Sequence, residues 1–324
     1  MEQKGLNESK RIFLWGFLLF LLVIPTLSTA QEYPTKPVVW VNPGGAGGSN
    51  DLTARAVASV APTYLGQPII VQLKGGGGGA IGTEFVAKAA PDGYTLCFGG
   101  PGWNSTLPAI EGTSKGPDDM AAVCRINYSA GFIVVRSDSP FKTLKELLEY
   151  AKANPDKLSY GNTGPWGAAY LPWKLIRYKT GIKTIDVPHP SGGDHLIALL
   201  GGQVQVIGVM SAQSLPHIKA GKLRALATFD DKRDPLLPDV PTVKEQGVDV
   251  VSRLWRGVLA PKGTPRPIID KLAGAFKKMC EDKSVIAMIK QFGDDIHYLG
   301  PDEFAKMWRE EYEAHKELGR ILKK

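Results

Sequence analysis

The sequence has only three cysteines in 324 residues, and no two of them have the CxxC spacing. Cysteines so few and so scattered exclude a fold built on a disulfide scaffold. We expect Cys97, Cys124 and Cys280 to be buried free thiols, although one pair could join in an oxidising compartment.

Motifs of catalysis and metal binding are also missing. The chain has no GxSxG elbow, no HExxH motif and no pair of carboxylates arranged for acid–base work. His189, Asp194 and His195 are close in sequence, but the last two are adjacent and should begin a helix facing different ways. We therefore expect no catalytic residues, no metal and no cofactor.

Runs of one charge are absent as well. Lys and Arg are scattered along a chain of formal net charge +7, which argues against nucleic acid as a partner. A mild positive balance fits attraction of small anions, and it fits plain solubility equally well. The length and the 43% hydrophobic content suit a globular protein with room for two domains.

The first thirty residues differ from the rest. Three basic residues precede the apolar run Ile12–Leu27, and small residues follow it up to Ala30. This pattern is typical of a secretory signal peptide cleaved after Ala30, and it predicts a periplasmic protein. A retained membrane anchor is the alternative, but the run is shorter than the roughly 20 residues of a spanning helix and contains Pro25.

After the leader, apolar strands alternate with helical patterns. "PVVWVNP", "QPIIVQL" and "YTLCFG" are predicted strands, with helices near 51–64 and 83–89 between them. A strand at "GFIVVR" is followed by a helix at "TLKELLEYAKANP", where Thr143 and Glu146 have capping-box spacing. This alternation predicts an α/β fold with mostly parallel sheets flanked by helices.

Two glycine-rich stretches follow the first two strands, "VNPGGAGGSND" at 41–51 and "LKGGGGGAIGTEF" at 73–85. Gly77, Gly79 and Gly82 match GxGxxG, the dinucleotide fingerprint. That fingerprint needs an acidic residue at the end of the next strand, and here the strand ends in "FGG". Nicotinamide cofactors are also scarce outside the cytoplasm, so we reject a dinucleotide site.

The two glycine stretches favour an anion site. Each precedes a helix, whose first N–H groups are unpaired and carry a partial positive charge. Loops after successive parallel strands lie side by side, and glycine lets an anion touch the backbone. Tight packing of helix on strand is the alternative, but five consecutive glycines exceed what packing requires.

Several longer motifs resemble a known family. "YPTKPVVWVNPGGAGGSNDLTAR", "GAIGTEFVAKAAPDGYTL", "LLGGQV", "LPHIKAGKLRALA", "LPDVPTVKEQG" and "LAPKGTP" are similar, in this order, to the substrate-binding proteins of the tripartite tricarboxylate transporter family, the Bug-type receptors. The resemblance implies a two-lobed periplasmic binding protein, type II-like, with the ligand cleft between the lobes. It implies lobe 1 from 31–130 and 252–324, lobe 2 from 131–251, and a hinge near Gly131 and Ser252.

The resemblance also implies which residues bind the ligand. In this family the loops after the first two strands clasp a ligand carboxylate. The matching positions are Gly44, Gly45, Ala46, Gly47, Gly48, Asn50, Gly76, Gly77, Gly78, Gly79 and Ile81.

The second lobe departs from the family pattern. Trp166, Ala168 and Val209 stand where relatives often have polar residues, and "PHPSGG" replaces the common "PYKGG". We expect the far side of the ligand to meet Trp103, Thr163, Trp166, His189, Ser191, Gly192 and Val209. Such a pocket favours an aromatic or apolar carboxylate. A dicarboxylate is the alternative, because Thr163 and Ser191 could pair a second carboxylate.

The sequence therefore predicts a receptor that binds a small organic carboxylate and delivers it to the permease subunits of a tripartite tricarboxylate transporter. We expect a monomer without nucleic-acid partners. The rival hypothesis is an exported enzyme acting on a small carboxylate.

Overall fold

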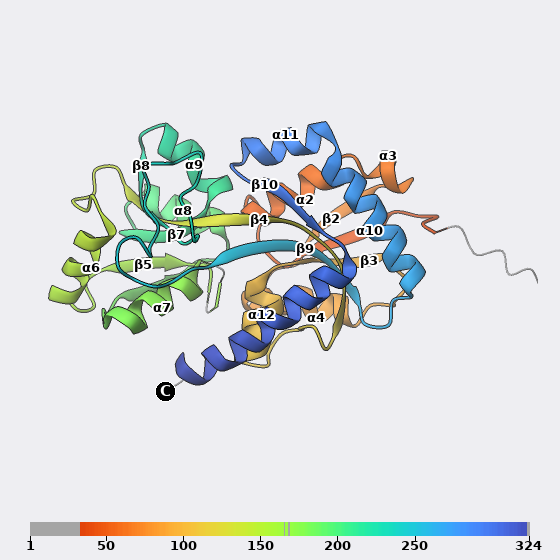
Figure 1. Ribbon diagram of the computed structural model, residues 1–324, viewed down its shortest axis with the longest axis horizontal. Helices are drawn as coiled ribbons and strands as arrows, with labels where there is room; N and C mark the ends of the chain where they lie inside the picture. The colour runs from red at the N-terminus through yellow and green to blue at the C-terminus, as the bar shows by residue number, and fades with distance from the viewer. Residues whose placement is uncertain (1–32, 165, 168, 323–324) are drawn as a thin grey trace, which may run out of the picture. The chain divides into compact units, whose positions relative to one another are not determined.

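The structure, a computed structural model, describes residues 33–164, 166–167 and 169–322 (Figure 1). The predicted signal peptide and Ala168 lie outside the described residues. Within them, no helix is at once long and apolar enough to cross a membrane.

The first sheet contains the strands predicted at the N-terminal end of the chain. It consists of β1 (Val38–Asn42), β2 (Ile69–Leu73), β3 (Thr95–Gly99), β9 (Arg253–Pro261), β10 (Asp295–Leu299) and the first part of β4 (Met120–Arg136). β1 pairs in parallel with β2 and β3, and β3 pairs antiparallel with β9. The carboxyl ends of β1, β2 and β3 therefore meet at one edge.

The second sheet repeats this arrangement with strands from the middle of the chain. It consists of β5 (Ser159–Asn162), β6 (Ile185–Pro188), β7 (Val206–Met210), β8 (Leu223–Thr228) and the last part of β4. β5 is parallel to both β6 and β7, whereas β4 is antiparallel to β7 and β8. The carboxyl ends of β5, β6 and β7 again share an edge.

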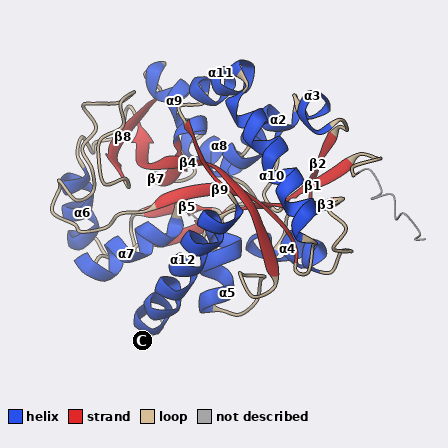
Figure 2. Cartoon of the chain, turned by 45° about the vertical axis from the view of Figure 1, so that its right-hand side comes forward, coloured by secondary structure: helices blue, strands red, loops and turns tan. Residues whose placement is uncertain are grey.

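Two long strands connect the sheets, as Figures 1 and 2 show. β4 pairs antiparallel with β9 from Met120 to Ala130, and beyond Gly131 it pairs with β7 and β8. The sequence predicted this strand only from Gly131 onward, whereas it begins at Met120. The lobe boundaries 31–130, 131–251 and 252–324 stay a prediction.

Helices cover both sheets. They are α2 (Ser49–Ala58), α3 (Ala61–Leu65), α4 (Ala80–Ala87), α5 (Leu107–Ile110), α6 (Leu144–Ala153), α7 (Tyr170–Thr180), α8 (Gly192–Leu200), α9 (Ser211–Lys219), α10 (Arg266–Glu281), α11 (Lys283–Gln291) and α12 (Pro301–Leu322). Short turns η1 (Gly77–Gly79) and η2 (Gly102–Thr106) precede α4 and α5. The predicted capping box of α6 is present, because Thr143 Oγ1 accepts from the Glu146 amide at 3.1 Å.

Aromatic side chains fill the core on both sheets. Tyr160 and Trp173 stack at 4.5 Å between ring centroids in the second sheet's core. Trp255 on β9 packs edge-on against Phe304 of α12, which also stacks with Trp308. Phe304 and Trp308 of α12 therefore belong to the core of the first sheet.

A fully buried ion pair links β9 to the residue just before β10, and β4 pairs with both of these strands. The Arg256 guanidinium donates to Asp294 at 2.8 Å and to Asn50 Oδ1 at 2.9 Å. The Asp294 carboxylate also accepts from Ser129 on β4 at 2.8 Å. Because Asn50 belongs to the first glycine-rich stretch, this network ties that loop to both connecting strands.

We predict that Asp294→Ala destabilises the protein by about 3–5 kcal/mol, because it leaves the buried Arg256 charge without its partner. Urea unfolding followed by circular dichroism measures the change. Asp295→Ala, at the exposed neighbouring position, is the matched control and should stay within about 0.5 kcal/mol of wild type. Equal stability of the two variants would contradict the prediction.

Candidate functional site

A cavity of about 480 Å³ lies at the strand ends of both sheets. From the first sheet it is lined by the loops after β1, β2 and β3, and from the second by the loops after β5, β6 and β7. Six strand-end loops therefore meet at one place, where open α/β sheets bind ligands. The prediction that the two glycine stretches lie side by side is confirmed.

The first glycine-rich loop is held open by its own side chains. Asn42 Oδ1 accepts from the Gly44 amide at 2.9 Å, and Asp51 Oδ2 accepts from the Gly47 amide at 3.1 Å. Arg55 pairs with Asp51 at 2.8 Å and compensates its charge. No side chain caps the start of α2, at Gly48, so the first turn of this helix can offer N–H groups to a ligand.

The backbone of the second loop explains four of its five consecutive glycines. Gly76, Gly77, Gly78 and Gly79 have φ values of +117°, +58°, +65° and +98°. Residues with a Cβ rarely adopt this region, and four in succession is open in practice only to glycine. α4 follows directly and, like α2, starts without a side-chain cap.

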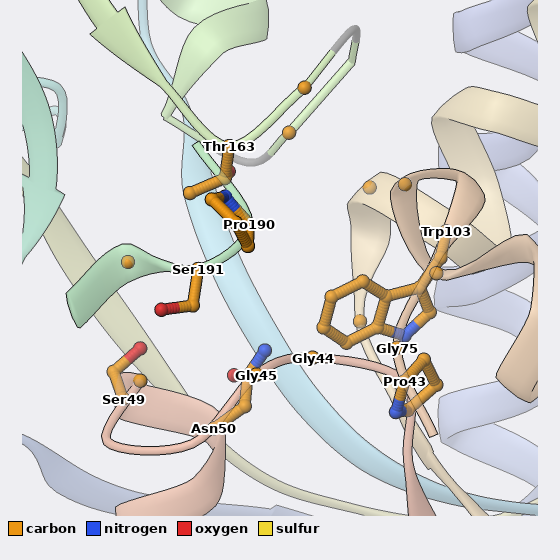
Figure 3. A pocket seen from close by; sticks show the side chains of 18 of the residues that line it. Pro43, Gly44, Gly45, Ser49, Asn50, Gly75, Trp103, Thr163, Pro190 and Ser191 are labelled. Atoms are coloured by element: carbon orange, nitrogen blue, oxygen red, sulfur yellow. The ribbon is translucent and has the colours of Figure 1, made fainter. Parts of the chain in front are cut away.

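Trp103 stands between the two loops (Figure 3). Its indole Nε1 donates to the Phe98 carbonyl at 3.2 Å. A Cβ at Gly79 would lie 2.7 Å from Trp103 Cβ, and one at Gly44 would lie 3.6 Å from the ring. The indole is thus packed against glycine backbone and presents an apolar surface to the cavity.

The opposite wall comes from the second sheet, with Thr163, Pro190 and Ser191 facing Trp103 across the cavity (Figure 3). Ser191 caps α8, accepting from the Asp194 amide at 3.2 Å and donating to its carboxylate at 2.6 Å. A Cβ at Gly45 would lie only 2.5 Å from Ser191 Cβ. The two walls therefore touch at Gly45 and Ser191.

Most of the predicted ligand-binding residues line this cavity. They are Gly44, Gly45, Gly48, Asn50, Gly76, Gly77, Gly78, Gly79, Trp103, Thr163, His189, Ser191, Gly192 and Val209. Four do not: Ala46 and Gly47 are exposed beside it, and Ile81 is 54% exposed, with its side chain against Gly76.

Trp166 is the fourth, and its place differs most from the prediction. It is 5% exposed and packs with Leu107, Ile110 and Leu171. Its indole N–H donates to Glu111, and the Lys174 ammonium lies 3.6 Å from its ring centroid. The side chain thus belongs to a small core beside the cavity, and one of the two tryptophans invoked for an apolar ligand is not part of the lining.

Sequence reasoning missed several lining residues, among them Ser49, Met210, Leu254, His195 and Gln213. His195 entered only as a rejected metal candidate. It is 3% exposed, and burial lowers its pKa to about 3. Because His195 follows β6 and Gln213 follows β7, the strand-end rule that identified the glycine loops would also have indicated them.

None of the described lining residues is Lys, Arg, Asp or Glu. Two charged pairs near the first loop are internally compensated, Asp51 with Arg55 and Arg256 with Asp294. An anion in this cavity would therefore be held by main-chain N–H groups, helix starts and neutral side chains.

Comparison with known proteins gives a consistent answer. The family model described as "Tripartite tricarboxylate transporter family receptor" matches residues 53–324. A curated relative from the gbd 5' region of Cupriavidus necator is 35% identical, over 93% of this chain and 91% of the relative. BugT of Bordetella pertussis is 30% identical, over 92% and 93%.

Solved structures agree over a similar span. Periplasmic binding protein BugD has a TM-score of 0.85 at 32% identity, covering 90% of this chain and 98% of its own. MatC from Rhodopseudomonas palustris, with bound malate, has a TM-score of 0.84 at 29% identity, covering 89% and 100%. Another R. palustris protein, with adipate, scores 0.84 at 27% identity, covering 90% and 98%. The predicted two-lobed α/β fold is confirmed.

We predict that Gly79→Ala destabilises the protein by about 1–3 kcal/mol, because it strains a residue at φ +98° and drives a methyl group into Trp103. Gly274→Ala is the matched control, since this exposed glycine within α10 has open space around it. Helix propensity should make that variant more stable by up to about 1 kcal/mol. Chemical denaturation compares them, and an unaffected Gly79→Ala protein would contradict the packing described here.

Proposed function

The chain belongs to the receptors of the tripartite tricarboxylate transporter family, and we propose that it captures a small organic carboxylate outside the cytoplasm and delivers it to a membrane permease of that transporter type. The observation that carries the proposal is the pair of glycine loops at uncapped helix starts, placed together at the edge of a ligand-sized cavity.

The loops suit a carboxylate because they offer main-chain N–H groups instead of a fixed positive charge. Each helix start carries roughly half a positive charge, and an anion there is typically stabilised by about 0.3–1 kcal/mol, more when partly buried. Glycine removes the side chains that would hold the ligand away from these groups. Malate and adipate, the ligands of the two similar R. palustris proteins, are both carboxylates, which supports this assignment.

The rest of the ligand meets a mixed wall. Trp103, Val209, Met210 and Leu254 supply apolar surface, which favours an aromatic or otherwise apolar carboxylate. Thr163 and Ser191 could pair a second carboxylate, so a dicarboxylate remains the alternative. We propose binding without turnover, so a bound acid should be recovered unchanged after prolonged incubation with the protein.

We predict that Gly78→Asp abolishes carboxylate binding, because it introduces a negative charge where the carboxylate would lie. Gly78→Asn is the matched control, since Asn and Asp both tolerate this φ of +65° and differ here only in charge. A thermal-shift screen of organic acids on wild type identifies ligands, since one at 100 times its Kd stabilises by about 2.7 kcal/mol.

Calorimetry with those acids should then show at least about a hundredfold loss in Gly78→Asp and a much smaller loss in Gly78→Asn. A folded Gly78→Asp protein with wild-type affinity would contradict the carboxylate assignment. The absence of any responding acid in the wild-type screen would contradict the function as a whole.

We predict that binding closes the cleft by bending at β4 and β9, and that Gly45→Ala blocks closure by placing a methyl group against Ser191. Small-angle scattering should show contraction on saturation of wild type and none for Gly45→Ala, which should bind at least about tenfold more weakly.

Ser191→Gly in the Gly45→Ala background removes the opposing Cβ and should restore contraction. Glycine at position 191 is tolerated at the start of α8 and should cost only a few tenths of a kcal/mol relative to serine. Equal scattering profiles of wild type with and without ligand would contradict closure.

A further inference from the structure

The wall of the cavity that the second sheet supplies contains buried polar atoms that no described protein group pairs. Both ring nitrogens of His195, Nδ1 of His189 and Nε2 of Gln213 are of this kind. His195 is 3% exposed and Gln213 is 8% exposed, and all three residues line the cavity. Buried polar atoms in proteins are paired almost without exception, so a cluster of unpaired ones needs an explanation.

The fold brings these side chains together from two strand ends. His189 follows β6, His195 lies in the first turn of α8, and Gln213 lies in the first turn of α9 after β7. The two imidazole rings are 6.4 Å apart between centroids. A Cβ at Gly192 would lie 2.7 Å from Gln213 Nε2, so the glycine leaves room for the amide beside the histidines.

The charge state of His195, the most deeply buried of the three, is set by its surroundings. Burial, and then the neighbouring His189, lower the pKa of His195 to about 3, while Asp194 acts in the opposite direction. Asp194 is exposed and accepts from the Ser191 hydroxyl. Asp194 does not line the cavity, and none of the described lining residues is Lys, Arg, Asp or Glu. At neutral pH the His195 ring is therefore uncharged and offers one N–H donor and one acceptor nitrogen.

We propose that His189, His195 and Gln213 form a subsite for a neutral group that both donates and accepts a hydrogen bond, a hydroxyl group on the end of the ligand remote from the carboxylate. This inference rests on the proposed function and makes the substrate class more specific, to hydroxy acids whose hydroxyl is distant from the carboxylate.

A hydroxyl fits because it can donate to the unprotonated ring nitrogen of His195 and accept from the Gln213 amide. A second carboxylate accepts only, so it could pair the ring N–H or the Gln213 amide but not the unprotonated nitrogen. It would also bring a charge to a cavity in which no described lining residue is Lys or Arg. A methyl group or ring edge would leave every one of these atoms unpaired, and sites built to pair a hydroxyl strongly reject analogues that lack it.

The test compares three matched series at pH 7.5 by calorimetry, because the distance between the two ends of the cavity selects the ligand length. They are butanoate, 4-hydroxybutanoate and succinate; hexanoate, 6-hydroxyhexanoate and adipate; and benzoate, 4-hydroxybenzoate and terephthalate. In the best-binding series, the hydroxy acid should bind at least about tenfold more tightly than the plain acid and the diacid. A diacid or a plain acid as the tightest ligand would overturn the subsite.

Variants assign the preference to particular atoms. His195→Phe and Gln213→Leu should each reduce the advantage of the hydroxy acid over the plain acid by at least about tenfold, with little change for the plain acid itself. Ile197→Ala is the control, because Ile197 on α8 is 69% exposed. This variant should keep the wild-type order of affinities for the three acids. An unchanged advantage in both folded subsite variants would overturn the assignment.

A spectroscopic measurement does not depend on affinity. Nitrogen-15 NMR of labelled histidine should show His195 as a neutral ring between pH 5 and 8, with and without 4-hydroxybenzoate or 6-hydroxyhexanoate. An imidazolium in the complex at pH 7 would overturn the neutral subsite. If no acid of any series binds, the proposed function fails, whereas binding without a hydroxyl preference removes only the subsite.

Discussion

The backbone conformation of Gly76–Gly79 is the constraint on which the rest of the site depends. Four consecutive residues with positive φ turn the chain sharply from β2 into α4 without side chains that would shield the backbone. The same absence of side chains lets Trp103 pack directly against Gly79. The loop thus shapes this end of the cavity and supports the Trp103 side chain. These two roles offset the entropic cost of ordering glycine on folding.

The two sheets use the same local device at their strand ends. Asn42 ends β1 and accepts from the Gly44 amide at 2.9 Å, and Asn162 ends β5 and accepts from the Gly164 amide at 2.9 Å. Each asparagine turns the chain away from its strand and points the following loop into the cavity. β4 and β9 join the two halves, and the Arg256 network fastens the first loop to these strands through Asn50. The first loop therefore moves with its own sheet when the cleft opens.

The sequence predicted the elements whose patterns are local. The capping box at Thr143 and the strand–glycine–helix order of the first hundred residues were both present as expected. The first half of β4 was missed because Arg125 and Asn127 interrupt its apolar pattern. Both side chains are buried, and both have hydrogen-bond partners that are distant in sequence. The His297 carbonyl, for example, accepts from the Arg125 guanidinium at 3.0 Å. Partners that a polar side chain gains only through the tertiary structure cannot be recognised in a short window of sequence.

The same distinction between local and tertiary information separates the two ends of the site. Glycine runs are visible in the sequence because they are a backbone requirement, so most of the glycine-loop residues that line the cavity could be predicted. Selection at the other end depends on single side chains such as His195 and Gln213, which acquire meaning only when α8 and α9 bring them together. Trp166 shows the opposite case. It is conspicuous in the sequence, but its indole N–H donates to Glu111 and its side chain does not line the cavity. Because a backbone clasp of the kind proposed would hold any carboxylate, the choice among acids would fall to the side chains of the second sheet's loops. There, the unpaired atoms of His195 and Gln213 would discriminate by hydrogen bonding rather than by charge.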